Sequence, residues 1–393
     1  MKKKTKQAGP AAWLRENKWT CAVLAAALVL LIVGRLLAAP ARVEAGQPEE
    51  RADYESAVVE QVLSDSTEKD PAADNGYRGE QLLLVTVKSG DYQGQQMQVY
   101  NYVGPLYGGP LHAGDRATIL ISSYSDGTVN ATVYEFDRLI PLAIVVALFI
   151  AAAVIVGGRT GAKSLVALAV TLMCLFGVLL PALMKGANTL LMTFIVCAYV
   201  AVVSLTIVGG VQKKSVCAML GAVAGTALAL LFGLLAQALT RVDGLRIEDV
   251  EPLLQLRQTG TPIGLRGLLV GGIIISALGA VMDVTMGIAS SLAEVHAANP
   301  QLSRRELFRS GMNIGRDMVG TMTNTLILAF LGSGFTLILY LYSLGLSFRQ
   351  LMSSAYVSME VVSGVASSVG VILSIPLTAL ITAAVLTREK QQS

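Results

Sequence analysis

Two acidic residues lie within or beside long apolar runs of the sequence. Asp283 interrupts GGIIISALGAVMDVTMGIASS, and Asp317 stands directly before MVGTMTNTLILAFLGSG. An ionised carboxylate in hydrocarbon is costly unless it is paired or hydrated, so such residues mark ion or proton pathways or fixed pairs. Both acids are therefore candidates for an ion or proton pathway, or for a fixed pair, inside a membrane.

Polar and small residues repeat at helical spacing around each acid. Asp283 shares one expected helix face with Gly279, Gly287 and Ser291, which lie at four-residue intervals. A second polar stripe surrounds Asp317 and consists of Asn313, Arg316, Gly320, Thr321, Asn324 and Thr325. A polar loop joins the two runs, so we expect an antiparallel helix pair with both acids towards the loop.

Two interpretations of the acids follow from spacing alone. In the structural one, Asp283 faces Arg316, Asn324 or Asp317, and the stripes hold two helices together. In the functional one, Asp283 takes up a proton or cation during a transport cycle, because desolvation favours the neutral carboxyl. Glu360 is a weaker candidate for the same pathway, with a capping or surface role as its alternative.

The composition indicates a polytopic membrane protein. The 393 residues are 53% hydrophobic and 15% charged, with a mean hydropathy of +0.60. A bilayer needs about 20 apolar residues per helix. An apolar run at 20–39 is followed by seven more, at 139–156, 164–183, 188–209, 216–239, 267–291, 318–342 and 361–386. We therefore predict about eight transmembrane helices.

Basic residues in the short loops indicate the orientation. With the N-terminus inside, 16 Lys and Arg residues fall in inside segments and 6 in the short outside loops. Cytoplasmic loops carry the excess of positive charge. We therefore expect both termini in the cytoplasm and residues 40–137 outside the cell membrane of a bacterium.

The sequence divides into four regions. Residues 1–39 form a basic N-terminus and a first helix, interpreted as a signal anchor, with a cleaved signal peptide as the alternative. Residues 40–78 are acidic and are predicted to form a linker with at most a short helix or strand near Tyr54–Leu63. Residues 79–137 contain four strand-like runs separated by turn sequences, which predicts a small all-β domain, an OB- or SH3-like barrel or sheet. Residues 138–393 form a seven-helix membrane domain.

Several other motifs lack the partners that their chemistry needs. His112 lies in a loop without a credible catalytic partner. GGRTGAKS at 157–164 resembles a phosphate loop, but Ala162 replaces the glycine before the lysine. Glu294 and His296 are two residues apart and point to different sides of a helix, which disfavours a metal site. We expect no enzyme activity, cofactor, metal or nucleic-acid partner.

The chain resembles the YibE/F-like family of bacterial multi-pass membrane proteins. The resemblance is carried by LGAVMDVTMGIASSLAEV and SGMNIGRDMVGTMTNTLILAFLGS, together with GGRTGAK and VKSGDYQGQ, and covers about residues 80–386. It implies a multi-pass membrane protein without a defined substrate. A looser similarity is to resistance-nodulation-division and SecD/SecF-type permeases, through Gly279 and Asp283 in a GxxxD context, and it is an analogy only.

These observations favour an ion-coupled secondary transporter or export component that uses the acids of the sixth and seventh helices. The expected partners are the lipid bilayer and a second copy or a sister YibE/F-like protein. The alternative is a non-transporting membrane scaffold or assembly protein whose outer domain binds a partner.

Overall fold

The computed structural model divides into two compact units, residues 43–152 and the remainder of the chain. It describes residues 50–387 with gaps at 72–75, 106, 125–127, 243–250, 259, 261 and 266, and before residue 50 only residues 25, 28 and 32. Apart from these three residues, the predicted signal anchor therefore lies outside the described part of the chain.

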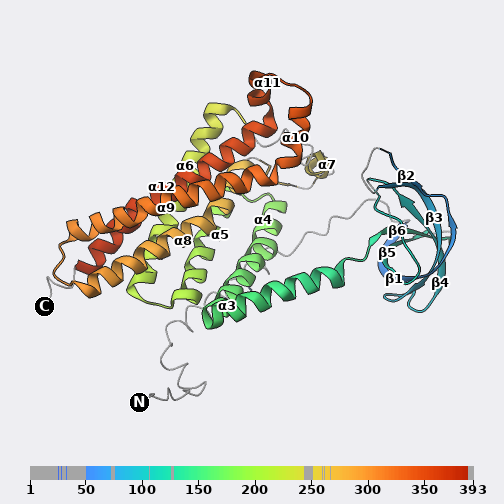
Figure 1. The fold of residues 1–393 in the computed structure, drawn as a ribbon, viewed down its shortest axis with the longest axis horizontal. Coiled ribbons are helices and arrows are strands. Elements are labelled where there is room, and N and C mark those ends of the chain that lie inside the picture. The colour runs from blue at the N-terminus through green and yellow to red at the C-terminus, as the bar shows by residue number, and fades with distance from the viewer. Residues whose placement is uncertain are drawn as a thin grey trace, which may run out of the picture. The chain divides into compact units, whose positions relative to one another are not determined.

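The first unit contains a closed β-barrel (Figure 1). Its strands are β1 (Glu50–Asp65), β2 (Glu68–Lys69), β3 (Tyr77–Val87), β4 (Gln96–Val103), β5 (Arg116–Tyr124) and β6 (Val129–Phe136). Five strands close the ring in the order β1-β5-β6-β4-β3, because β1 pairs with both β5 and β3. Strands β4 and β6 pair in parallel and the other pairs of the ring are antiparallel. The predicted small all-β domain is therefore confirmed as a barrel, and this strand order is that of the OB-like alternative rather than the SH3-like one.

Strand β1 corrects the predicted linker at 40–78. Residues 50–58 pair with β5 and residues 57–65 pair with β3, so this segment is an integral wall of the barrel. Its Ala57 and Val59 are buried in the barrel core with Leu83, Val99 and Ile119. The acidic residues Asp53, Glu55, Glu60 and Asp65, which suggested a linker, occupy exposed or half-buried positions of this strand.

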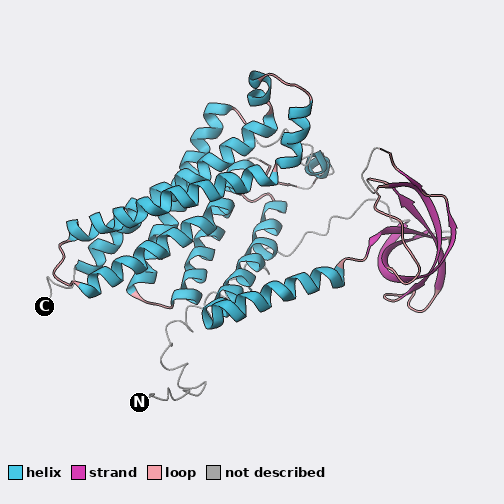
Figure 2. Ribbon diagram, in the orientation of Figure 1, coloured by secondary structure: helices cyan, strands magenta, loops and turns pink. Residues whose placement is uncertain are grey.

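The rest of the described chain is helical (Figure 2). Its elements are α3 (Leu139–Cys174), a π-helical turn η1 (Leu175–Leu179), α4 (Leu180–Met184), α5 (Thr189–Gly209), α6 (Lys213–Thr240), α7 (Glu251–Gln258), α8 (Leu268–Ala298), α9 (Arg304–Ser333), α10 (Phe335–Ser343), α11 (Phe348–Ser353) and α12 (Ala355–Thr387). A non-helical residue, Gly158 (φ 55°, ψ −131°), interrupts α3.

The described residues do not confirm eight transmembrane helices. Five helices are long and apolar enough to cross a membrane, or six if α9 and α10 form one bent span. The predicted runs at 139–156 and 164–183 fall within one helical stretch, Leu139–Met184, broken only at Gly158. The predicted run at 318–342 is divided at Gly334 into α9 and α10, whose axes differ by 63°.

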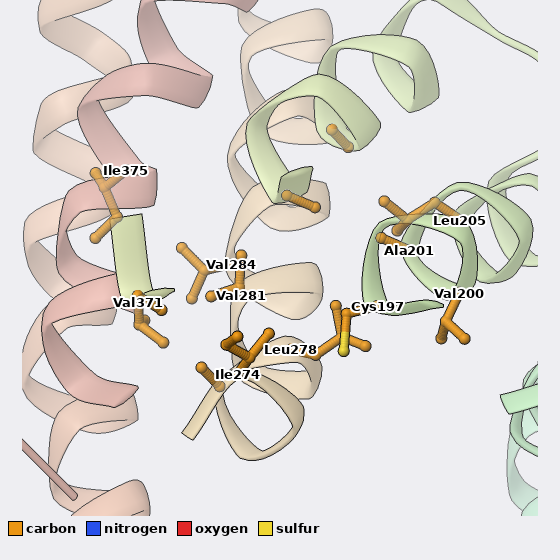
Figure 3. Close-up of a cluster of buried hydrophobic side chains, with 14 of the residues drawn as sticks. Cys197, Val200, Ala201, Leu205, Ile274, Leu278, Val281, Val284, Val371 and Ile375 are labelled. Carbon is orange, nitrogen blue, oxygen red and sulfur yellow. The ribbon is translucent and has the colours of Figure 1, made fainter. Parts of the chain in front are cut away.

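Helix α8 contributes to the core of the helical unit through an apolar face. Figure 3 shows its Ile274, Leu278, Val281 and Val284 between side chains of α5 and α12. Helix α6 packs against α12 at two glycines, where an added Cβ would lie 2.1 Å from Thr378 Oγ1 at Gly221 and 2.5 Å from Ser374 Cβ at Gly225. This small-xxx-small glycine pair therefore lets the two helices approach closely.

Candidate functional site

Helices α8 and α9 form the hairpin that carries the two acids. The loop 299–303 joins them, and a capping box fixes the start of α9. Ser303 Oγ accepts from the backbone N–H of Glu306 at 3.3 Å, and Glu306 Oε2 accepts from the backbone N–H of Ser303 at 2.8 Å. This reciprocal arrangement satisfies two helix-terminal donors and sets the register of α9.

Glycines bring α9 close to its neighbours on the buried side. An added Cβ at Gly315 would lie 2.2 Å from Ile375 Cγ2, and one at Gly311 would lie 2.9 Å from Ala379 Cβ, both on α12. Leu307 and Leu326 are buried as well. This packing fixes which face of α9 is turned away from the helical unit.

Asp283 lies on the open face of α8. Its side chain is exposed, and so is Gly279, where an added Cβ would meet nothing within 4 Å. Gly287 and Ser291 are half-buried, and an added Cβ at Gly287 would lie 3.0 Å from Met318 Cε of α9. A glycine therefore allows close approach on one side of Asp283, whereas the other side is open.

The polar stripe of α9 is exposed along its whole length. Its members are Asn313, Arg316, Asp317, Gly320, Thr321, Asn324 and Thr325. Its hydrogen bonds are local: Arg316 Nη1 donates to Asn313 Oδ1 at 3.3 Å, and Thr321 Oγ1 donates to the Met318 carbonyl at 3.1 Å. Among the described residues, the stripe therefore bonds to no neighbouring helix.

The expected pairing of Asp283 with Arg316, Asn324 or Asp317 is absent from the described part of the chain. Neither carboxylate, Asp283 nor Asp317, forms a hydrogen bond or an ion pair among the described residues. The fixed-pair interpretation of Asp283 therefore has no support from the structure. Two carboxylates on open faces of adjacent helices can exchange protons or bind a cation if water or another chain covers them.

Glu360 lies apart from these stripes. It is half-buried on α12 and lines a cavity of about 330 Å³ between α9, α10, α11 and α12. The sequence indicates the acid but not the cavity, because the lining residues come from four helices. The only available signal was an acid beside the small-residue face at Ser363 and Gly364.

The other motifs occupy ordinary structural positions. His112 is exposed, with its Nδ1 3.6 Å from Asp115 Oδ2 in the same loop. The GGRTGAKS segment lies within α3, and its residues after Gly158 are helical. Within the described ranges, no group of three or more His, Cys, Asp or Glu side chains could hold a metal ion.

The barrel also has an exposed aromatic surface that is not among the residues predicted from the sequence. Tyr100 and Tyr102 project from β4 with their ring centroids 6.4 Å apart and their planes at 18°, and Tyr107 lies 6.5 Å from Tyr102. Their exposed fractions are 45%, 48% and 64%. The alternation Tyr-Asn-Tyr in a strand was the available signal, since residues two apart share a face.

A family model described as YibE/F-like protein matches residues 145–388. No curated protein and no solved structure matches the chain. The matched segment contains α8, α9 and α12, and therefore every candidate residue described above in the helical unit.

Proposed function

This chain belongs to the YibE/F-like family, and we propose that it is an ion-coupled secondary transporter or export component. The apolar helices and the family indicate a membrane protein. In the proposed arrangement it lies in the bacterial cell membrane with both termini in the cytoplasm and the barrel outside, as the distribution of basic residues favours.

The observation that carries the proposal is the open polar face of the α8–α9 hairpin. Asp283 and Asp317 are exposed and unpaired within the described chain, on helices that otherwise bury apolar side chains. Lipid cannot satisfy carboxylates, a guanidinium and amides, so this face needs water or protein against it. A second copy or a sister YibE/F-like protein would complete a polar path along it.

The two acids have different roles in this proposal. Asp283, beside the open Gly279, exchanges a proton or cation between the two sides of the membrane. Asp317 stands next to Arg316, whose cation moderates the charge of the carboxylates on the shared face. Thr321 and Asn324 supply neutral hydrogen-bonding groups further along α9, so a desolvated ion or substrate group has partners beyond the acids.

Replacing Asp283 tests the proposal. The protein is reconstituted in proteoliposomes that contain a pH-sensitive dye, and a potassium diffusion potential is imposed. Inorganic and organic cations are then added one at a time as candidate substrates, and the dye reports proton movement. We expect Asp283→Asn to reduce cation-dependent proton movement at least tenfold, because the amide cannot carry the proton. Glu294→Gln, an exposed acid elsewhere on α8, is the matched control. Equal flux in Asp283→Asn and the unmodified protein would remove Asp283 from the mechanism.

The scaffold alternative is favoured by the exposed tyrosines of the barrel. Tyr100, Tyr102 and Tyr107 form a contiguous aromatic patch beside a shallow pocket that includes Arg78 and Pro105. Exposed aromatic clusters are typical of binding surfaces, since the rings offer apolar area and a hydroxyl together.

A barrel variant discriminates the two functions. The variant is Tyr100→Ser/Tyr102→Ser/Tyr107→Ser. If it no longer captures a partner, and if neither it nor the unmodified chain produces protein-dependent flux, the scaffold function is favoured. Flux that survives in this variant and disappears in Asp283→Asn would favour the transporter.

A further inference from the structure

The bend between α9 and α10 creates a cavity in the helical unit. Helix α9 ends at Ser333 and α10 begins at Phe335, and the axes of the two helices differ by 63°. The two helices therefore diverge beside α12. The resulting cavity has a volume of about 330 Å³, at the small end of ligand sites, which span about 300–1,000 Å³. Ile327, Leu337 and Leu351 contribute to its apolar wall.

One carboxylate enters this apolar wall. Glu360 of α12 lines the cavity, and its Cγ lies 3.6 Å from the position that a Cβ would take at Gly334. The Glu360 side chain therefore lies directly beside the bend at Gly334. The carboxylate forms no hydrogen bond or ion pair within the described ranges, and no basic residue lines the cavity.

An anion in such a wall favours a cation as its partner. Burying a carboxylate without a compensating charge or hydrogen bond is costly, so a ligand that brings a positive charge is selected. Phe330 and Tyr356 also line the cavity, and aromatic rings attract organic cations through their faces. Ca²⁺ or Mg²⁺ would need about six oxygen ligands, and Glu360 is the one carboxylate among the lining residues.

We propose that this cavity binds an organic cation, an ammonium or similar group on an apolar body. The charge lies against Glu360 and the aromatic rings, and the apolar body fills the space between α9 and α10. The site is separate from the Asp283–Asp317 face, and the proposal does not depend on transport.

Two probes of similar shape test the charge requirement. The purified full chain in detergent is dialysed to equilibrium against radiolabelled tetraphenylphosphonium, a permanent apolar cation, or against neutral triphenylphosphine. We expect Glu360→Gln to weaken tetraphenylphosphonium binding at least tenfold and to leave triphenylphosphine binding within twofold. Retained binding of the neutral probe shows that the cavity still forms. Glu294→Gln is the matched control and should bind both probes as the unmodified chain does.

A second variant tests the cavity itself. Gly364 lines the wall, and a Cβ there would lie at an ordinary contact distance, 3.5 Å, from Phe330 Cδ2. Gly364→Leu extends into the space and should weaken both probes alike. The proposal would be overturned if Glu360→Gln bound tetraphenylphosphonium as tightly as the unmodified chain does. It would also be overturned if Glu360→Gln bound both probes more weakly to the same extent.

Competition identifies the source of the cation. Displacement of tetraphenylphosphonium by phosphatidylethanolamine, but not by phosphatidylglycerol, assigns the site to a lipid ammonium group. Displacement by tetrabutylammonium without an effect of either lipid assigns it to free organic cations. Displacement by phosphatidylglycerol as readily as by phosphatidylethanolamine would indicate an acyl-chain site and contradict the proposal.

Discussion

Gln81 shows how a single polar residue organises the barrel. Its Oε1 accepts from Asn101 Nδ2 and from the backbone N–H of Leu111, both at 2.9 Å. Its Nε2 donates to Asp65 Oδ2 at 2.9 Å and to the Leu111 carbonyl at 3.3 Å. All four hydrogen-bonding positions of this buried amide are satisfied. It therefore links β3 to β4, to the end of β1 and to the loop between β4 and β5.

The same network predicts a pH dependence of barrel stability. The hydroxyl and backbone N–H of Thr67 and then the Gln81 amide donate to Asp65, and these bonds hold the pKa of its carboxyl below the usual value near 3.8. A folded-state pKa below the unfolded one stabilises the fold at neutral pH, and this stabilisation is lost as the pH falls through the folded-state value.

We therefore expect Asp65→Asn to unfold at lower urea than the unmodified chain at pH 7, with the difference shrinking at acid pH. Tyrosine fluorescence is a suitable signal, since 8 of the 12 tyrosines lie between residues 54 and 134. A difference between the two proteins that stays constant from neutral to acid pH would contradict this account.

At the scale of elements, close glycine contacts decide how the helices pack. Helix α12 contacts α6, α8 and α9, and its Gly370 faces Ala229 of α6, where an added Cβ would lie 2.6 Å from Ala229 Cβ and 3.2 Å from its Cα. A backbone contact of this kind cannot relax by rotating a side chain. The two helices must separate to admit a methyl group.

This packing predicts a contrast between two glycines. Gly370→Ala should destabilise the helical unit by about 1–3 kcal/mol, because the added methyl overpacks the α6–α12 contact. Gly272→Ala should be neutral or slightly stabilising, since nothing lies within 4 Å of its added Cβ and alanine favours the helix. Thermal unfolding in detergent measures both. Equal melting temperatures for the two variants would refute the close contact.

At the scale of the whole molecule, the proposed assembly rests on the α8–α9 hairpin face that no other described residue covers. Its exposed groups include the Arg316 guanidinium, the carboxylates of Asp283 and Asp317, and the Asn324 amide. These charges include both signs, so two copies, or this chain and a sister protein, can pair them across an interface.

Disulfide cross-linking in membranes tests this assembly. With the four native cysteines changed to alanine, Thr321→Cys on the polar face should form an intermolecular disulfide under mild oxidation. Leu220→Cys, exposed on α6, should cross-link at least fivefold less, because an apolar surface is satisfied by lipid. If the α6 position cross-links as efficiently as the α9 position, the polar face is not a preferred interface.

The sequence by itself determined the elements whose patterns are local. Long apolar runs predicted both ends of α5 and α6 within three residues, and those of α8 and α12 within seven. Alternating strands with Gly-rich turns predicted β3 to β6. Helical spacing also placed Asp317 and Thr321 on one stripe. Periodicity depends on neighbours a few residues away, so it can be read from the chain.

Only the tertiary structure decided the features that join distant residues. Strand β1 belongs to the barrel because β5 and β3 pair with its two halves, a relation that its acidic composition hides. The bend at Gly334 and the cavity at Glu360 depend on how four helices meet. The open environment of Asp283 depends on which face of α8 other helices cover. Packing selects among locally equivalent helix faces, and that choice is made between elements far apart in the sequence.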